Sequence, residues 1–245
     1  MTAAPVTHYP PARAAIFDMD GLLVDSEPFW KSVEVDVFAA LGVDIMPLIA
    51  QGLTMGMRVD EVVAFFRSRL PWEGPDDAEV IARIVDGIVC AIWEEATLLP
   101  GAVAAIDFFT DLGYATALAS GSTPPVIDAV LQRFDLVERF PVVCSAIDDR
   151  LGKPHPAIFL RTAEALGVDP LECVVLEDSL NGCIAAKAAR MRVIAVPSLA
   201  YQDDQRFGIA DVRLLSLLEV VSPVVAEVLG VRDAVTGDAW QGAAR

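Results

Sequence analysis

The sequence predicts a doubly wound α/β protein with an inserted α-helical subdomain. Short runs rich in Val, Ile and Ala alternate with segments of helical periodicity along most of the chain. These runs lack the polar alternation of a half-exposed sheet, so we expect parallel strands whose two faces are covered by helices. One long interval contains helical patterns and no convincing strand. A Rossmann-like parallel-sheet core that is interrupted by a helical insertion explains both observations.

Six runs of residues are the expected strands. They are 14–18, 114–120, 141–145, 173–177 and 193–197, with a weaker one at 211–214. The helices expected between them are 101–112, 124–134, 155–167 and 179–190. Leu-Gly or Met-Arg pairs near the helix ends agree with known stop signals.

The interval 28–97 is far longer than an ordinary connection in an α/β domain. Its helical patterns lie at 29–41, 59–70 and 76–95. We therefore expect 28–97 to form a helical cap subdomain. The α/β core is then discontinuous, consisting of 12–27 and 98–220. Residues 221–245 are expected to form a C-terminal helix and a disordered tail.

The composition is that of an ordinary globular protein, with 54% hydrophobic and 22% charged residues. No apolar run reaches the roughly 18 residues that a membrane helix needs, and the N-terminal segment lacks the apolar stretch of a signal peptide. The four cysteines include no Cys-x-x-Cys pair, so we expect neither a disulfide framework nor a zinc site. Cysteines of this kind are typical of proteins in a reducing compartment. We expect a cytoplasmic protein with no membrane partner.

The net charge of −17 argues against a nucleic-acid partner, because phosphate backbones are bound by clustered Lys and Arg. It does not exclude a small phosphorylated substrate. A divalent cation and one lysine can reverse the sign of the charge locally.

Residues 16–27, with the sequence IFDMDGLLVDSE, are the most informative segment. Asp18 is expected at the end of the first strand, and Asp20 in the turn that follows it. Two carboxylates this close repel each other unless a cation lies between them or one holds a proton. The spacing fits phosphoryl transfer, where one carboxylate attacks phosphorus and the other handles the proton. The alternative is a solvated Asp-x-Asp-Gly turn.

A strand that ends in Ser120 is followed by Gly121 and Ser122 and then by a helix. The Ser120 hydroxyl and the amides of Gly121 and Ser122 could donate hydrogen bonds to phosphate oxygens. The same pattern is also an ordinary strand-to-helix turn with an N-cap.

Lys153 lies in the segment Gly-Lys-Pro-His-Pro. Its ammonium could neutralise phosphate charge and restrain a carboxylate nucleophile. The alternative is a surface lysine in a proline-rich loop. We expect His155, two residues on, to pack or cap a helix rather than to act as an acid or base.

Glu177 and Asp178 follow another buried-type strand. Mg²⁺ prefers oxygen ligands and keeps several waters, so it needs only one or two protein carboxylates. Asp178, Asp18 and the main-chain carbonyl of Asp20 would suffice. Asp178 could also act as a helix N-cap, with or without a metal.

Taken in order, these four segments resemble the motifs of the haloacid dehalogenase superfamily, and the resemblance covers about 14–218. The insertion at 28–97 resembles the small α-helical cap of one subclass. More narrowly, the stretch FDMDGLLVDSEPFW is similar to bacterial phosphatases that act on hexitol phosphates and 2-deoxyglucose 6-phosphate, as are 51–58 and 71–75.

The resemblance implies a Mg²⁺-dependent hydrolase of small sugar or polyol phosphates that works through an aspartyl-phosphate intermediate. By this likeness Asp18 is the nucleophile, Asp20 the acid and base, and Lys153 balances charge. Ser120 and Gly121 hold the phosphoryl oxygens. Mg²⁺ lies between Asp18, the carbonyl of Asp20 and Asp178, and Glu177 supports it. The expected partner is one small phosphorylated metabolite, and we expect a monomer.

Substrate choice is expected to come from the cap, with Trp30, Met55, Met57 and Arg58 as candidates. Arg58 could bind sugar hydroxyls or an anionic group, or it could form a structural salt bridge. Trp30 could instead pack in the cap core. A β-phosphoglucomutase-like sugar phosphomutase is the second hypothesis, although mutases of this group carry a histidine where this chain has Trp30. A binding protein without turnover is the third.

Overall fold

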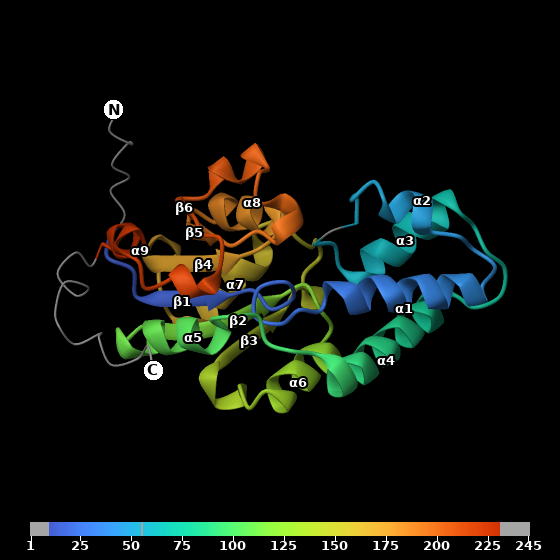
Figure 1. Ribbon diagram of the computed structural model, residues 1–245, viewed down its shortest axis with the longest axis horizontal. Coiled ribbons are helices and arrows are strands. Elements are labelled where there is room, and N and C mark those ends of the chain that lie inside the picture. The colour runs from blue at the N-terminus through green and yellow to red at the C-terminus, as the bar shows by residue number, and fades with distance from the viewer. Residues whose placement is uncertain (1–9, 55, 231–245) are drawn as a thin grey trace.

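A computed structural model describes residues 10–54 and 56–230. Its centre is a sheet of six parallel strands in the order β3-β2-β1-β4-β5-β6 (Figure 1). The strands are β1 Ala14–Phe17, β2 Ala115–Ser120, β3 Val142–Ser145, β4 Cys173–Glu177, β5 Arg192–Ala195 and β6 Val212–Arg213. The predicted α/β fold is confirmed, and each strand lies within one or two residues of its expected position.

Helices cover both faces of the sheet, as the uniformly apolar strands predict. They are α5 Ala102–Asp111, α6 Pro124–Arg133, α7 Ala157–Leu166, α8 Leu180–Ala188 and α9 Pro223–Leu229. Neighbouring residues of β1 point to opposite faces. Phe17 contacts the edge of Phe109 in α5, with ring centroids 5.7 Å apart. Ile16 belongs to the apolar cluster on the other face, together with Phe159 of α7.

Four helices occupy the insertion between β1 and α5, which we call the cap. They are α1 Glu27–Ala40, α2 Met46–Ile49, α3 Val59–Arg69 and α4 Asp77–Glu95. Phe38 lies at the centre of the cap, in edge contact with Phe66 and Trp72 at centroid distances of 5.1 and 5.3 Å. The four-residue helix α2 is too short to show periodicity, and the sequence did not predict it.

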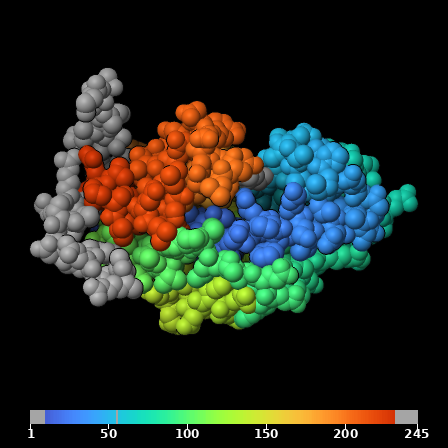
Figure 2. All heavy atoms as spheres, viewed as in Figure 1, coloured from blue at the N-terminus to red at the C-terminus, as the bar shows by residue number. Residues whose placement is uncertain are grey.

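The two connections between core and cap lie side by side. The Asp25 amide donates to the Thr97 carbonyl at 3.1 Å, and the Leu99 amide donates to the Leu23 carbonyl at 2.9 Å. In Figure 2 the cap, in blue and cyan, adjoins the core, and a notch separates the segment around α2 from the orange segment around α8. We propose 28–97 as the cap subdomain and 12–27 with 98–220 as the core.

The predicted C-terminal tail begins with α9, and its remaining residues, 231–245, lie outside the described residues. Met55, one of the cap candidates, also lies outside them. Within 10–54 and 56–230, no helix has both the length and the hydropathy needed to cross a bilayer.

Candidate active site

The topology of the sheet brings three of the predicted segments together. Strand β1 lies between β2 and β4, and Phe17 is in register with Leu118 and Leu176. The residues just beyond these positions therefore meet at the carboxyl edge of the sheet. The order of the strands also reverses at β1, which is where open α/β sheets form their binding crevices.

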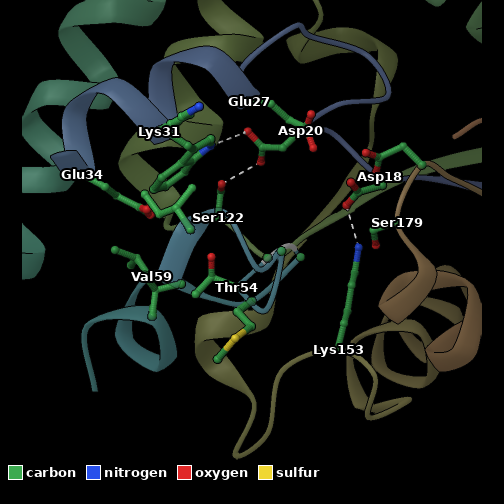
Figure 3. Close-up of a pocket in the computed structure, with 18 of the residues that line it drawn as sticks. Asp18, Asp20, Glu27, Lys31, Glu34, Thr54, Val59, Ser122, Lys153 and Ser179 are labelled. Atoms are coloured by element: carbon green, nitrogen blue, oxygen red, sulfur yellow. Dashed lines mark hydrogen bonds and ion pairs between the residues drawn. The ribbon is translucent and has the colours of Figure 1, made fainter. Parts of the chain in front are cut away.

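Asp18, Glu177 and Asp178 form a buried acidic cluster at this edge. Each offers a carboxylate oxygen, and these oxygens all lie within 4.8 Å of one another. Nζ of Lys153 donates to Oδ1 of Asp18 at 2.6 Å (Figure 3). It also donates to Oε1 of Glu177. Lys153 is only 6% exposed, so the surface-lysine alternative is wrong.

The charges of this cluster do not balance. Burial raises the pKa of Asp18 to about 7, against the lowering effect of Lys153. Burial, reinforced by Glu177 and Asp18, also raises the pKa of Asp178 well above its ordinary value. Burial alone would lower the pKa of Lys153, but Asp18 and Glu177 outweigh it and the pKa is raised. Three carboxylates beside one ammonium leave negative charge that a divalent cation would neutralise, so the residues fit a divalent metal site.

Two glycines make room for these carboxylates. A Cβ on Gly21, whose φ is +74°, would clash with Oδ2 of Asp178. A Cβ on Gly182 would clash with the carboxylate of Glu177. The cluster therefore depends on residues without side chains on two separate segments.

Glu177 is held in place by the start of α8. Its Oε2 accepts hydrogen bonds from the amide and the hydroxyl of Ser179, both at 2.8 Å. Oγ of Ser179 in turn accepts from the Gly182 amide at 3.0 Å and caps α8. Ser179 is thus the N-cap of this helix, and the prediction that Asp178 is the helix N-cap is wrong.

The side chain of Asp20 lies apart from the acidic cluster and is surrounded by donors. Its Oδ1 accepts from Oγ of Ser26 at 2.6 Å and from Nε1 of Trp30 at 3.1 Å. Its Oδ2 accepts from Oγ of Ser122 at 2.7 Å and from Oγ of Ser120 at 3.3 Å. Trp30 belongs to cap helix α1, so this carboxylate is held jointly by core and cap.

A cavity of about 570 Å³ lies between the core and the cap. Asp18, Lys153 and Gly121 line it from the core. The cap contributes Trp30, Lys31, Glu34, Ile49, Met57, Val59 and Val62. Figure 3 shows the labelled residues around this space, with Lys153 and Glu34 at opposite ends of the view.

Two predicted substrate-binding residues do not line the cavity. Ser120 is fully buried, donates to Asp20 and accepts from the Ser122 amide at 3.0 Å, and Ser122 lines the cavity in its place. The guanidinium of Arg58 donates to the carbonyls of Ala146 (2.9 Å) and Asp149 (2.7 Å) and pairs with Asp60 at 2.7 Å. Of the two roles considered for Arg58, the structure shows the structural salt bridge, which lies at the start of α3, and the hydrogen bonds to the two carbonyls tie α3 to the core.

Sequence reasoning missed other residues of the site. Ser122 lines the cavity and Ser26 donates to Asp20, but neither hydroxyl could be predicted, because serine is common in turns. Glu34 did give a sequence signal. It lies between Trp30 and Phe38 at spacings of four on α1, and is therefore a charged residue on an otherwise apolar helix face. His155, by contrast, is exposed and accepts a hydrogen bond from the Ala157 amide at the start of α7, as expected for a capping residue.

The sequence pattern of haloacid dehalogenase-like hydrolases matches residues 12–190. The chain belongs to this family. Hexitol phosphatase B of Escherichia coli (strain K12) is 47% identical over 209 residues, which are 85% of this chain and 94% of that protein. This family member also shares its fold with the crystal structure of CbbY from Rhodobacter sphaeroides in complex with phosphate. That match has a TM-score of 0.78 and 28% identity, and it covers 85% of this chain and 96% of CbbY.

The β-phosphoglucomutase of Clostridium difficile matches with a TM-score of 0.76 over 89% of this chain and 97% of that one. Its sequence is 21% identical, so this likeness concerns the fold alone.

Proposed function

We propose that this hydrolase is a Mg²⁺-dependent phosphatase of small sugar or polyol phosphates that works through an aspartyl phosphate on Asp18. The observation that carries the proposal is the ion pair of Lys153 with Asp18, at the edge of a cavity that a second carboxylate, Asp20, also lines. The similarity to hexitol phosphatase B supports a hexitol or related sugar phosphate as the substrate.

In the first half of the reaction, a carboxylate oxygen of Asp18 attacks phosphorus and the bond to the leaving alkoxide breaks. The alkoxide takes a proton from the carboxyl group of Asp20. In the second half, Asp20 removes a proton from water, the resulting oxygen attacks phosphorus, and the bond between phosphorus and Asp18 breaks. Phosphate is released and both carboxyl groups return to their starting states.

Positioning and charge neutralisation provide most of the rate in phosphoryl transfer. Lys153 orients Asp18 and adds positive charge beside the phosphoryl group. The Gly121 amide would donate to a phosphoryl oxygen, and the hydroxyls of Ser120 and Ser122 orient Asp20. Glu177 positions Lys153.

Asp18, Asp178 and the main-chain carbonyl of Asp20 would hold Mg²⁺, with Glu177 close by in support. When bound, the ion supplies positive charge to the phosphoryl oxygens and to the acidic cluster.

A sugar phosphomutase is the rival function. A mutase must deliver protons to and from a sugar hydroxyl that is itself phosphorylated in turn. The cap residue that hydrogen-bonds to Asp20 among the described residues is Trp30, whose indole N–H is only a donor and cannot shuttle a proton. This favours hydrolysis over phosphoryl exchange.

Trp30→Phe tests the role of the indole. Phe keeps the aromatic body and removes the hydrogen bond to Asp20, so we expect kcat to fall about tenfold with little change in KM. Trp93→Phe, at an exposed tryptophan of α4, is the matched control. A Trp30→Phe enzyme with wild-type kcat would show that the indole does not position Asp20.

Removal of the metal tests the function itself. Phosphate release is measured from hexitol, hexose, pentose and small-acid monophosphates before and after EDTA, and again after Mg²⁺ is restored. We expect release from hexitol or hexose phosphates, a loss of about 10³-fold with EDTA, and recovery with Mg²⁺. Isomerisation of a sugar 1-phosphate without phosphate release would favour the mutase, and no reaction with any ester would remove the proposed function.

We also propose that the enzyme is a cytoplasmic monomer. Its four cysteines are free, and Cys144, Cys173 and Cys183 are buried. This usage fits a reducing compartment.

A further inference from the structure

Glu34 is a buried acid in the cap that the proposed chemistry does not use. It lies on α1, one helical turn beyond Trp30, and is 8% exposed. Its side chain lines the cavity (Figure 3). Among the described residues it has no hydrogen-bond or ion-pair partner. Burial raises its pKa to about 7.

The walls around Glu34 do not satisfy its carboxylate. Ile49, Val59 and Val62 are among the apolar residues that the cap contributes to the lining. A buried carboxylate among apolar groups needs hydrogen-bond donors. Here a ligand bound in the cavity can provide them. A ligand with several hydroxyl groups provides such donors.

The charges that line the cap side of the cavity make a second requirement of the ligand. Asp25 and Glu27, where the chain enters the cap, and Glu34 within the cap are acidic, and Lys31 is the cation that the cap contributes among the described lining residues. Lys153 is already paired with Asp18 and Glu177. A ligand with a second phosphate or a carboxylate would meet three carboxylates there against the single ammonium of Lys31.

We propose that Glu34 is a specificity residue, which accepts hydrogen bonds from the hydroxyls of an uncharged polyhydroxy leaving group and repels a leaving group with a second negative charge. The inference rests on the proposed phosphatase function. Trp30 and Glu34 lie on one face of α1 about 6 Å apart along the helix axis, so Asp20 would serve the phosphate end of the substrate and Glu34 its distal hydroxyls.

The test compares kcat/KM for three esters at pH 8 with Mg²⁺. They are a hexitol 6-phosphate, a hexonate 6-phosphate of equal length that ends in a carboxylate, and 4-nitrophenyl phosphate, which has no hydroxyl donors. The enzymes are wild type, Glu34→Gln and Glu34→Leu. Asp36→Asn is the matched control, because Asp36 is an exposed acid on the same helix and does not line the cavity.

We expect Glu34→Leu to lower kcat/KM for the hexitol phosphate by about 10- to 100-fold and to leave 4-nitrophenyl phosphate within about twofold. Glu34→Gln should raise kcat/KM for the hexonate phosphate by about tenfold, a gain that an unfolded variant cannot produce. Asp36→Asn should match wild type with all three esters.

Hexitol phosphate turnover that is unchanged in Glu34→Leu would overturn the inference and leave the phosphatase in place. A wild-type preference for an amino sugar phosphate over its parent sugar phosphate, lost in Glu34→Gln, would also overturn it in favour of an amine. No phosphate release from any ester by the wild type would instead remove the proposed function itself.

Discussion

Asp18→Asn is expected to lower kcat for phosphate release by about 10⁴-fold or more, because a carboxamide does not attack phosphorus. The variant should keep its fold, since Asn has nearly the same shape and removes one of three crowded carboxylates. Acid-quenched wild-type enzyme should carry a phosphoryl group by mass spectrometry, and the variant should carry none.

Asp128→Asn is a control for this change, because Asp128 is an exposed acid on α6, remote from the acidic cluster. It should retain wild-type kcat. An Asp18→Asn enzyme with a tenth of wild-type activity would mean that another group attacks phosphorus.

Lys153→Met is expected to have the largest effect on stability. It leaves Asp18 and Glu177 buried without their cation, and breaking such a buried pair costs about 3–5 kcal/mol. For a chain of this size, the loss corresponds to a fall in Tm of roughly 6–20 °C. Saturating Mg²⁺ should restore part of it, because a bound cation takes over the neutralisation. Activity should fall as well, since Asp18 loses its orienting partner.

The stability loss should depend on pH, with a definite sign. Lys153 lowers the pKa of Asp18, which burial raises to about 7, so without the lysine the folded-state pKa of Asp18 lies higher still. A carboxyl whose folded pKa is raised above its unfolded value destabilises the fold as pH rises between the two. Wild type shares this loss up to about pH 7, so the Tm difference between Lys153→Met and wild type should widen above about pH 7, measured without Mg²⁺.

Lys187→Met is the matched control for this experiment. Lys187 pairs with Asp211 at 2.8 Å, with both side chains about one-fifth exposed, so its removal should cost only about 1 kcal/mol. An equal loss in both variants would show that the cluster around Lys153 has no special dependence on its cation.

The sequence was enough to predict the core of the fold and the residues at its carboxyl edge. Strands without polar alternation are buried on both faces. Two of the catalytic candidates, Asp18 and Asp178, follow such strands directly, and the third, Lys153, lies in a proline-rich loop. The direction of a side chain is harder to predict. Ser120 is expected to face the phosphate, yet it is fully buried and donates to Asp20, whereas Ser122, two residues further on, lines the cavity.

The cap was less predictable than the core for a physical reason. Its sequence is constrained mainly by packing between helices, and a polar side chain such as Arg58 can donate hydrogen bonds either to a ligand or to a neighbouring loop. Only the carbonyls of Ala146 and Asp149, some ninety residues away in sequence, decide between these roles. Glu34 shows the converse, since its position on an otherwise apolar helix face is a sequence signal that our predictions did not use.

Because the two connections between core and cap are adjacent, the cap can change in sequence and length independently of the core. The backbone leaves the core at Asp25 and returns at Thr97, and these two residues are joined by a hydrogen bond. An inserted segment of almost any length and sequence can therefore connect the same two points. The entropy of closing such a loop grows only slowly with its length. Substitutions, insertions or whole replacements between these points can therefore change which leaving group fits, while Asp18, Lys153 and Asp178 stay in place at the carboxyl edge of the sheet.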